Sequence, residues 1–249
     1  MTDPSDWHAD PAFWIDSYPF LFPPESYVEQ ERVLPQILAL AGRERGAVLD
    51  LSCGPGRHAV PLARRGFGVT GVDSTPFLLD KARELAGQEG VEVELVLEDM
   101  RRFVRPAAFD LALNLTVSFG YFEDPAENLR VLENVYASLR PGGVFVLEVS
   151  GKEVTARGYH DTGSWGGPDK GYVVQRRRII DDWSRMEVEW VFALPGTTRF
   201  LTTRHWLYSG QELKALLAGA GFTRVDLYGS FAGAPYGSEA ETLIAVAVK

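Results

Sequence analysis

The chain has 249 residues, of which 45% are hydrophobic and 12% aromatic, and a formal net charge of −9. This composition suits one large α/β domain with a full core and excludes a disordered or fibrous protein. Nucleic acid is a poor partner for so acidic a chain, because duplex binding depends on basic side chains that neutralise phosphates. No apolar stretch is long enough to cross a bilayer. We therefore expect a small-molecule substrate and neither a nucleic-acid nor a membrane partner.

The single cysteine excludes an internal disulfide framework, and the acidic first residues lack the basic and apolar regions of a signal peptide. A cytoplasmic enzyme is therefore expected. No group of His, Cys, Asp or Glu residues has the spacing of metal ligands, so we expect no metal. The oligomeric state is left open.

Helical and strand periods alternate through the first 150 residues, starting with a helical stripe over residues 29–40. Five strands are expected, at residues 47–51, 68–73, 91–97, 109–115 and 144–149. Strands joined by helices form a parallel sheet with right-handed crossovers. Ligands of such a sheet bind beyond the carboxyl ends of its strands, so we expect the site there.

The last hundred residues change character. Three strands joined by short turns are expected at residues 172–180, 186–194 and 200–208, followed by a helix capped by Ser209 and by strands at 224–228 and 242–248. The glycine-rich stretch 158–171 is interpreted as a loop. We predict one domain over residues 1–249, with an N-terminal lid segment at 1–30 and an antiparallel β insertion, or flap, at 151–208.

A glycine loop, DLSCGPGRHA, occupies residues 50–59 between a strand and a helix. Its glycines allow the backbone to approach a ligand closely. The spacing Gly54-x-Gly56-x-x-Ala59 also satisfies the dinucleotide fingerprint, which is weak evidence by itself. Asp73 ends the second strand, where a carboxylate accepts hydrogen bonds from the ribose of an adenosine ligand. A nicotinamide cofactor and S-adenosylmethionine are both open at this point.

Two features favour S-adenosylmethionine. Asp50 ends an apolar strand, where an unpaired carboxylate is costly unless the ligand brings the positive charge of an ammonium or a sulfonium. The helix that follows would suit a pyrophosphate, but S-adenosylmethionine has no phosphate and does not need that contact. After the third strand, Glu98-Asp99-Met100 offers polar groups for the edge of an adenine and a flexible apolar side chain for its face.

The motif VLDLSCGPG at residues 48–56 resembles the first motif of the class I S-adenosylmethionine-dependent methyltransferases. Asp73 matches the ribose-binding acidic residue of that superfamily, and Asp99-Met100 matches its adenine-contacting pair. Residues 109–115 resemble its fourth strand. The turn LRPGG, which leads into the expected fifth strand, also resembles the superfamily pattern. Together these motifs cover about residues 30–150, and the chain's final 41 residues, 209–249, resemble the end of that fold.

This resemblance implies a Rossmann-like, doubly wound α/β fold with seven strands, mostly parallel with a reversed final strand, plus the small antiparallel insertion. The insertion is similar to that of a bacterial small-molecule methyltransferase subgroup. Ser52 stands where the usual pattern has glycine. Because a serine can occupy an extended conformation at a strand end, we expect cofactor binding to survive. The resemblance implies that these residues contact the cofactor: Tyr27, Asp50, Ser52, Gly54, Gly56, Asp73, Ser74, Asp99, Met100 and Leu115.

The predicted function is direct in-line transfer of a methyl group from S-adenosylmethionine to a nitrogen or oxygen atom of a small acceptor. Tyr18, Tyr121 and His160 are candidates for helping to orient or deprotonate the acceptor. We expect none of them to be an indispensable base. The alternatives are an NAD(P)-dependent oxidoreductase and a non-catalytic module that binds S-adenosylmethionine.

Arg176 and Arg178 alternate with apolar residues along one expected strand. If the following turn centres on Asp182, they share the inner face of the insertion and hold an acidic group of the substrate. If the register is one residue different, they lie on the solvent side as ordinary surface charges.

Overall fold

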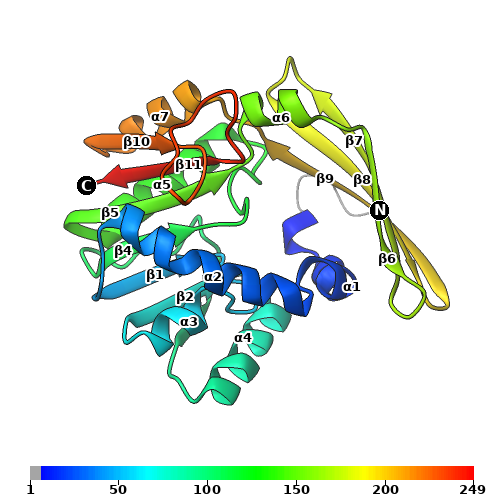
Figure 1. Ribbon diagram of the computed structural model, residues 1–249, viewed down its shortest axis with the longest axis horizontal. Coiled ribbons are helices and arrows are strands. Elements are labelled where there is room, and N and C mark those ends of the chain that lie inside the picture. Colours follow the sequence, from blue (N-terminus) through cyan, green and yellow to red (C-terminus); the bar gives the residue numbers. More distant parts are fainter. Residues whose placement is uncertain (1–6) are drawn as a thin grey trace.

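The computed structural model describes residues 7–249, which form two β-sheets with N-terminal helices between them (Figure 1). The larger sheet has the strand order β10-β11-β5-β4-β1-β2-β3, and β11 alone runs opposite to the other strands of this sheet. Its strands are β1 (Ala47–Leu51), β2 (Gly68–Asp73), β3 (Glu94–Leu97), β4 (Phe109–Asn114), β5 (Leu139–Val149), β10 (Arg224–Tyr228) and β11 (Leu243–Val248). The predicted seven-stranded fold with a reversed final strand is confirmed.

Helices cover both faces of this parallel sheet: α2 (Pro24–Ala41), α3 (Ala59–Arg64), α4 (Pro76–Glu89), α5 (Pro125–Ser138) and α7 (Gly210–Gly219). Side chains alternate along a strand, so β1 sends Val48 to one face and Leu49 to the other. Val48 packs in a buried cluster with Leu34 of α2, and Leu49 packs in a second cluster with Leu132 of α5. Both faces are therefore buried, as a doubly wound sheet requires.

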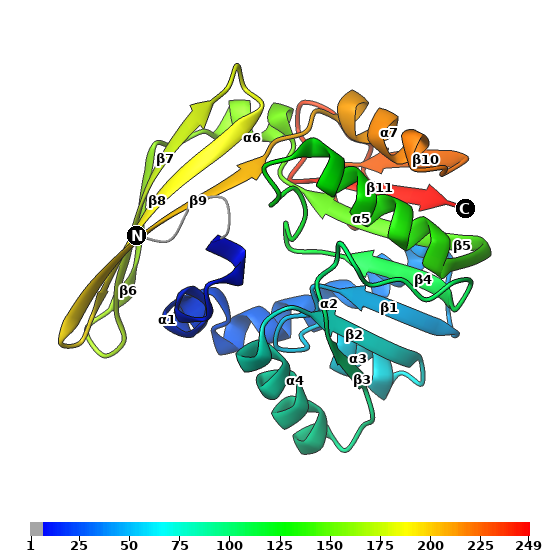
Figure 2. The same ribbon diagram turned by 180° about the vertical axis from the view of Figure 1, so that it is seen from behind.

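A second sheet of four antiparallel strands, in the order β6-β7-β8-β9, extends away from the first (Figure 2). It contains β6 (Thr162–Gly167), β7 (Gly171–Ile180), β8 (Arg185–Leu194) and β9 (Thr197–Trp206), and α6 (Lys152–Gly158) leads into it. The prediction of a loop over residues 158–171 is wrong, because β6 forms there. Its glycines hide the strand pattern, yet Gly166 is required: a Cβ at that position would lie 2.3 Å from the Gly171 carbonyl oxygen.

The turn between β7 and β8 sets the register of the second sheet. It holds four residues, 181–184, and three of them, Asp181, Asp182 and Trp183, have positive φ. This turn pairs Arg178 with Glu187 and Arg176 with Glu189, not with Met186 and Val188. The predicted placement of Arg176 and Arg178 on the inner face is wrong, and the alternative register is the observed one.

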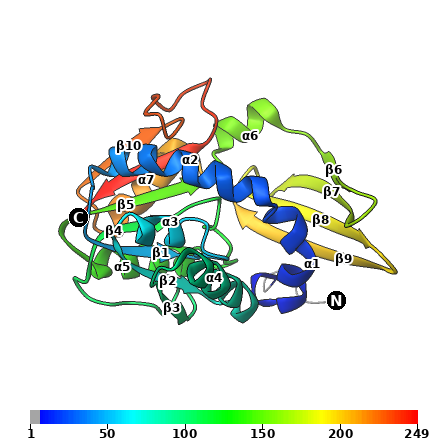
Figure 3. The same cartoon turned by 60° about the horizontal axis from the view of Figure 1, so that its bottom comes forward.

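The N-terminal segment lies between the two sheets. It contains the 3₁₀ helix η1 (Trp7–Ala9) and α1 (Pro11–Leu21), and Figure 3 shows α2 crossing the parallel sheet toward them. Trp7, Phe13 and Phe20 pack with the inner face of the second sheet in one buried aromatic cluster. The Trp7 indole N–H donates to the Arg204 carbonyl at 3.0 Å, which fastens the segment to β9.

None of the helices within residues 7–249 combines the length and the apolar character that a membrane span needs.

Candidate functional site

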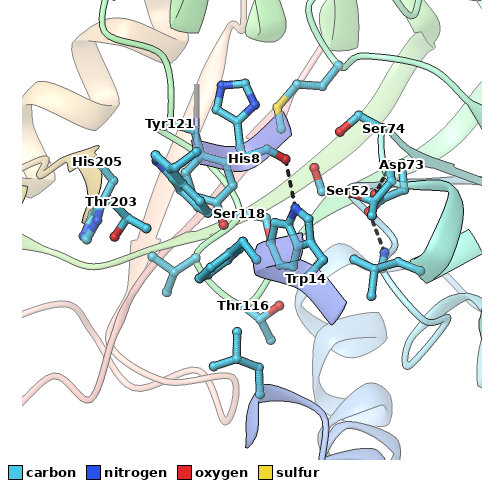
Figure 4. A pocket seen from close by; sticks show the side chains of 18 of the residues that line it. His8, Trp14, Ser52, Asp73, Ser74, Thr116, Ser118, Tyr121, Thr203 and His205 are labelled. Atoms are coloured by element: carbon cyan, nitrogen blue, oxygen red, sulfur yellow. Dashed lines mark hydrogen bonds between the residues drawn. The ribbon is translucent and has the colours of Figure 1, made fainter. Parts of the chain in front are cut away.

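A cavity of about 510 Å³ lies where the carboxyl ends of the parallel strands face the second sheet. Figure 4 shows Ser52, Asp73 and Ser74 on one side of it and Thr203 and His205 on the other. Its walls come from the glycine loop, from the segments after β2, β3 and β4, from the N-terminal helices and from the second sheet. The cavity therefore joins the motif-bearing half of the molecule to the insertion.

The glycine loop is held in place by Asp73. Its carboxylate accepts hydrogen bonds from the backbone N–H groups of Gly54 and Thr75, both at 2.9 Å. Gly56 has φ +86°, and a Cβ there would lie 3.1 Å from Val60 and 3.2 Å from Ala82, so the turn into α3 requires glycine. The loop is therefore built around one carboxylate that also lines the cavity.

Ser52 departs from its expected conformation. Its φ is +60°, in the left-handed region, so the prediction of an extended backbone is wrong. The chain turns sharply here between β1 and α3, and a side chain in that conformation costs on the order of 1 kcal/mol. This backbone explains why the superfamily pattern has glycine at the position.

Asp50 is buried at 2% exposure, and its Oδ2 atom has no hydrogen-bond partner among residues 7–249. Burial, with a smaller contribution from Asp73, raises the pKa of this carboxyl to about 7. A buried, incompletely satisfied carboxylate is stabilised by a nearby positive charge. Asp50 itself is not one of the residues that line the cavity.

Asp99 and Met100 both line the cavity beyond β3. The Asp99 carboxylate accepts hydrogen bonds from the backbone N–H of Arg101 at 2.8 Å and from its guanidinium Nε at 3.0 Å. These contacts help to hold the Asp99 pKa below its ordinary value although burial opposes them. The short segment after β3 is thereby fixed against the cavity wall.

Arg57 is a cavity residue that the sequence reasoning missed. Its guanidinium lies 4.7 Å from the centre of the Phe22 ring and donates to Thr116 Oγ1 at 3.3 Å. Burial lowers its pKa, and no carboxylate among residues 7–249 pairs with it within 4.0 Å. A half-buried guanidinium without an anion is a ready binding group for one. The sequence signal for Arg57 was its position in the glycine loop, directly after Gly56 and before α3.

The side of the cavity away from the glycine loop lies where the loop after β4 meets β9. The Trp206 backbone N–H donates to the Gly120 carbonyl at 2.7 Å, and this bond joins the two segments. Tyr121 packs edge-on against Trp7 with ring centres 4.7 Å apart, and burial raises its pKa to about 12. Burial lowers the pKa of His205 to about 4, so this imidazole is neutral at pH 7. His205 was not singled out from the sequence.

Seven of the predicted site residues line the cavity: Ser52, Gly54, Asp73, Ser74, Asp99, Met100 and Tyr121. Gly56, Leu115 and Asp50 are not lining residues, and neither are Tyr18 and Tyr27, whose hydroxyls hydrogen-bond each other at 3.0 Å. Burial is the main cause of a raised pKa at Tyr27.

Three predicted residues lie elsewhere. Arg176 and Arg178 are exposed on the outer face of the second sheet, where Arg178 pairs with Glu187 at 2.6 Å and with Glu189 at 2.9 Å. His160 is also exposed and does not line the cavity.

Comparison with known proteins agrees with this architecture. Residues 48–143 match a family model described as a methyltransferase domain. A glycine/sarcosine N-methyltransferase from Halorhodospira halochloris is 27% identical over 212 residues, which cover 83% of this chain and 77% of that protein. A cypemycin N-terminal methyltransferase from a Streptomyces species is 28% identical over 209 residues, covering 80% and 81% of the two chains.

Among solved structures, an S-adenosylmethionine-dependent methyltransferase from Clostridium acetobutylicum superposes with a TM-score of 0.78 at 16% identity, covering 95% of this chain and 97% of that one. A likeness at this identity supports the fold alone. The matched methyltransferase domain contains the glycine loop, Asp73 and Asp99, and two curated methyltransferases align along most of the chain. The matched domain and the aligned relatives thus support a class I S-adenosylmethionine-dependent methyltransferase.

Proposed function

We propose that this enzyme methylates a nitrogen or oxygen atom of a small molecule in the cavity between the two sheets. The observation that carries the proposal is the continuity of the cavity, from the motif residues on one side to the inner face of the second sheet on the other. S-adenosylmethionine supplies the methyl group on a sulfonium whose leaving group is a neutral thioether. The protein's task is then to align donor and acceptor and to exclude water.

The cavity residues fit this cofactor. Asp73 has carboxylate lone pairs beyond its two backbone bonds, which suit ribose hydroxyls. Asp99 and Met100 suit the adenine. Arg57, which lines the cavity, suits the carboxylate of the methionine part. Asp50 does not line the cavity, but its buried and partly unsatisfied carboxylate favours a cationic ligand nearby. Both positive and negative groups of the cofactor thus find an opposite charge.

We propose supporting roles in cofactor binding for the remaining predicted residues and for the N-terminal segment. Ser74 contributes from the cavity wall, while Gly56 and Leu115 support the wall from behind. Tyr27 contributes indirectly, through its hydrogen bond to Tyr18. The N-terminal segment acts as a lid, since Trp7 and Trp14 line the cavity. The lid predicted for residues 1–30 begins outside the described residues.

On the acceptor side, we assign the positioning of the reacting atom to His205 and Tyr121. A neutral imidazole accepts a hydrogen bond from an N–H or O–H group, which aims the lone pair of the acceptor at the methyl group. Glycine, sarcosine and an N-terminal group appear in the names of the two relatives, and their chemistry favours an amine over an alcohol as the acceptor. His160 lies outside the cavity, so we assign it no role.

Ligand-dependent unfolding tests the proposed cofactor. S-adenosylmethionine and S-adenosylhomocysteine should each raise the Tm, and at a hundredfold excess over Kd a ligand specific for the native state adds about 2.7 kcal/mol. NAD(P) should give no shift. A shift with NAD(P) alone would favour the oxidoreductase alternative.

A panel of small amines and alcohols, monitored for S-adenosylhomocysteine release, then tests the reaction. Tight cofactor binding with no turnover on any member would support the non-catalytic alternative.

A further inference from the structure

The inner face of the second sheet presents one arginine to the cavity, and it is Arg177 and not its two neighbours. Arg177 lines the cavity together with Gln175, two residues earlier on β7. The guanidinium Nη2 donates to Gln175 Oε1, and Nη1 donates to the His160 carbonyl at 3.5 Å. Within residues 7–249 no carboxylate approaches this guanidinium to 4.0 Å, whereas Arg178 next to it pairs with two glutamates.

Gln175 fixes the direction of this guanidinium. Its side chain is only 6% exposed, and a buried amide oxygen needs a donor. Arg177 provides that donor through one of its five N–H groups, which leaves others free for a second acceptor. A forked guanidinium held from one side is well suited to a bidentate contact with a planar carboxylate.

The charges around the cavity are unevenly distributed. Its lining carboxylates lie at or just after the carboxyl ends of strands of the parallel sheet, Asp73 at the end of β2 and Glu98 and Asp99 after β3. The second sheet contributes no carboxylate to the described lining; its polar groups there are Gln175, Arg177, Thr203 and His205. An anionic group on the acceptor would therefore be attracted by Arg177 on this side and would not be repelled by a carboxylate of the second sheet.

An apolar strip separates Arg177 from His205. In the register of the sheet, Arg177 lies opposite Val188, which in turn lies opposite Thr203, and His205 is opposite Met186. Neighbouring strands are about 4.8 Å apart, so β7 and β9 are separated by about 10 Å across β8. Met186, Val188 and Trp190 of β8 cover the distance between them.

We propose that the acceptor is an amphipathic carboxylate: its carboxylate binds Arg177, its apolar body lies on β8, and its nucleophilic atom lies beside His205. This inference rests on the proposed function and specifies its substrate class. The sequence predicts this role for Arg176 and Arg178, and the observed register gives it to Arg177 between them.

Binding of a matched pair of probes tests the proposal. Protein saturated with S-adenosylhomocysteine is titrated with 3-phenylpropionate and with 3-phenylpropionamide, which has the same skeleton without the charge. Calorimetry should show at least tenfold tighter binding of the carboxylate. Arg177→Met should reduce this preference to within about twofold, and Arg177→Lys should restore part of it.

Arg176→Met is the matched control, because Arg176 is the adjacent residue on the same strand but is exposed on the outer face. The control should keep the full preference. Equal binding of the two probes, binding of neither, or a preference that survives Arg177→Met would each overturn the proposal. Failure of the wild-type protein to bind S-adenosylhomocysteine would instead overturn the proposed function, so the two failures are distinguishable.

Discussion

The two sheets line the cavity in different ways. The parallel sheet uses backbone groups and loop geometry: Asp73 organises Gly54 and Thr75, and Gly56 permits the turn. The second sheet uses side chains that project from strands, so its binding surface depends on which residues alternate inward. The first kind of site holds one cofactor and tolerates little change. The second can change specificity by single substitutions, which suits the recognition of the acceptor.

The largest effect that would sharpen this contrast is expected from Asp73→Ala. Loss of a charged acceptor costs about 1.5–3 kcal/mol, so S-adenosylhomocysteine binding should weaken roughly 10- to 100-fold by calorimetry. Stability should also fall, because two backbone N–H groups lose their partner. Asp110→Ala is the control: Asp110 also accepts from a backbone N–H, that of Ala47 at 2.8 Å, but does not line the cavity. Wild-type affinity in folded Asp73→Ala would refute the ribose assignment.

A second effect depends on pH and concerns the cofactor side. Burial lowers the pKa of His58 to about 3, whereas an unfolded histidine has a pKa of about 6.5. Below pH 6.5 His58 is protonated in the unfolded chain but stays neutral in the folded chain. The stability that neutral His58 contributes is therefore present above pH 6.5 and is lost toward pH 3. The stability advantage of the wild type over His58→Gln should therefore shrink by about 2 kcal/mol between pH 7 and pH 5.

Urea unfolding of both proteins at the two pH values measures this difference. Asp50, whose pKa is raised to about 7, acts with the opposite sign in both proteins and cancels in the comparison. A difference that does not change with pH would show that His58 is protonated in the folded state as easily as in the unfolded one.

The smallest effect should appear on the acceptor side alone. His205→Asn removes the neutral imidazole and should lower kcat/KM about tenfold, or 1.4 kcal/mol, while S-adenosylhomocysteine affinity stays unchanged. His160→Asn is the matched control, since His160 is exposed and does not line the cavity, and this variant should stay within threefold of wild type. Loss of cofactor affinity in His205→Asn would break the division between the two sides.

The parallel sheet was predictable because its local signals agree with one another. Buried strands, proline-started helices and the glycine loop specify the same topology, and the cofactor residues follow from it. The second sheet was predictable only in part. β6 is glycine-rich, and the turn after β7 centres between Asp182 and Trp183 and not on Asp182, which reverses the faces that Arg176 and Arg177 occupy. His205 could not be identified as a cavity residue from the sequence, because it reaches the cavity only where β9 contacts the loop at Gly120.

Trp206 fastens the second sheet beside the cavity by two hydrogen bonds, from its backbone N–H to the Gly120 carbonyl at 2.7 Å and from its indole N–H to the Phe122 carbonyl at 2.8 Å. His205 directly precedes this anchor, while the turn at Gly196 lies at the opposite end of β9. No residue of the outer turns, 168–170 and 195–196, is among the described residues that line the cavity. Insertions in those turns should therefore leave both the cavity wall and the Trp206 anchor in place.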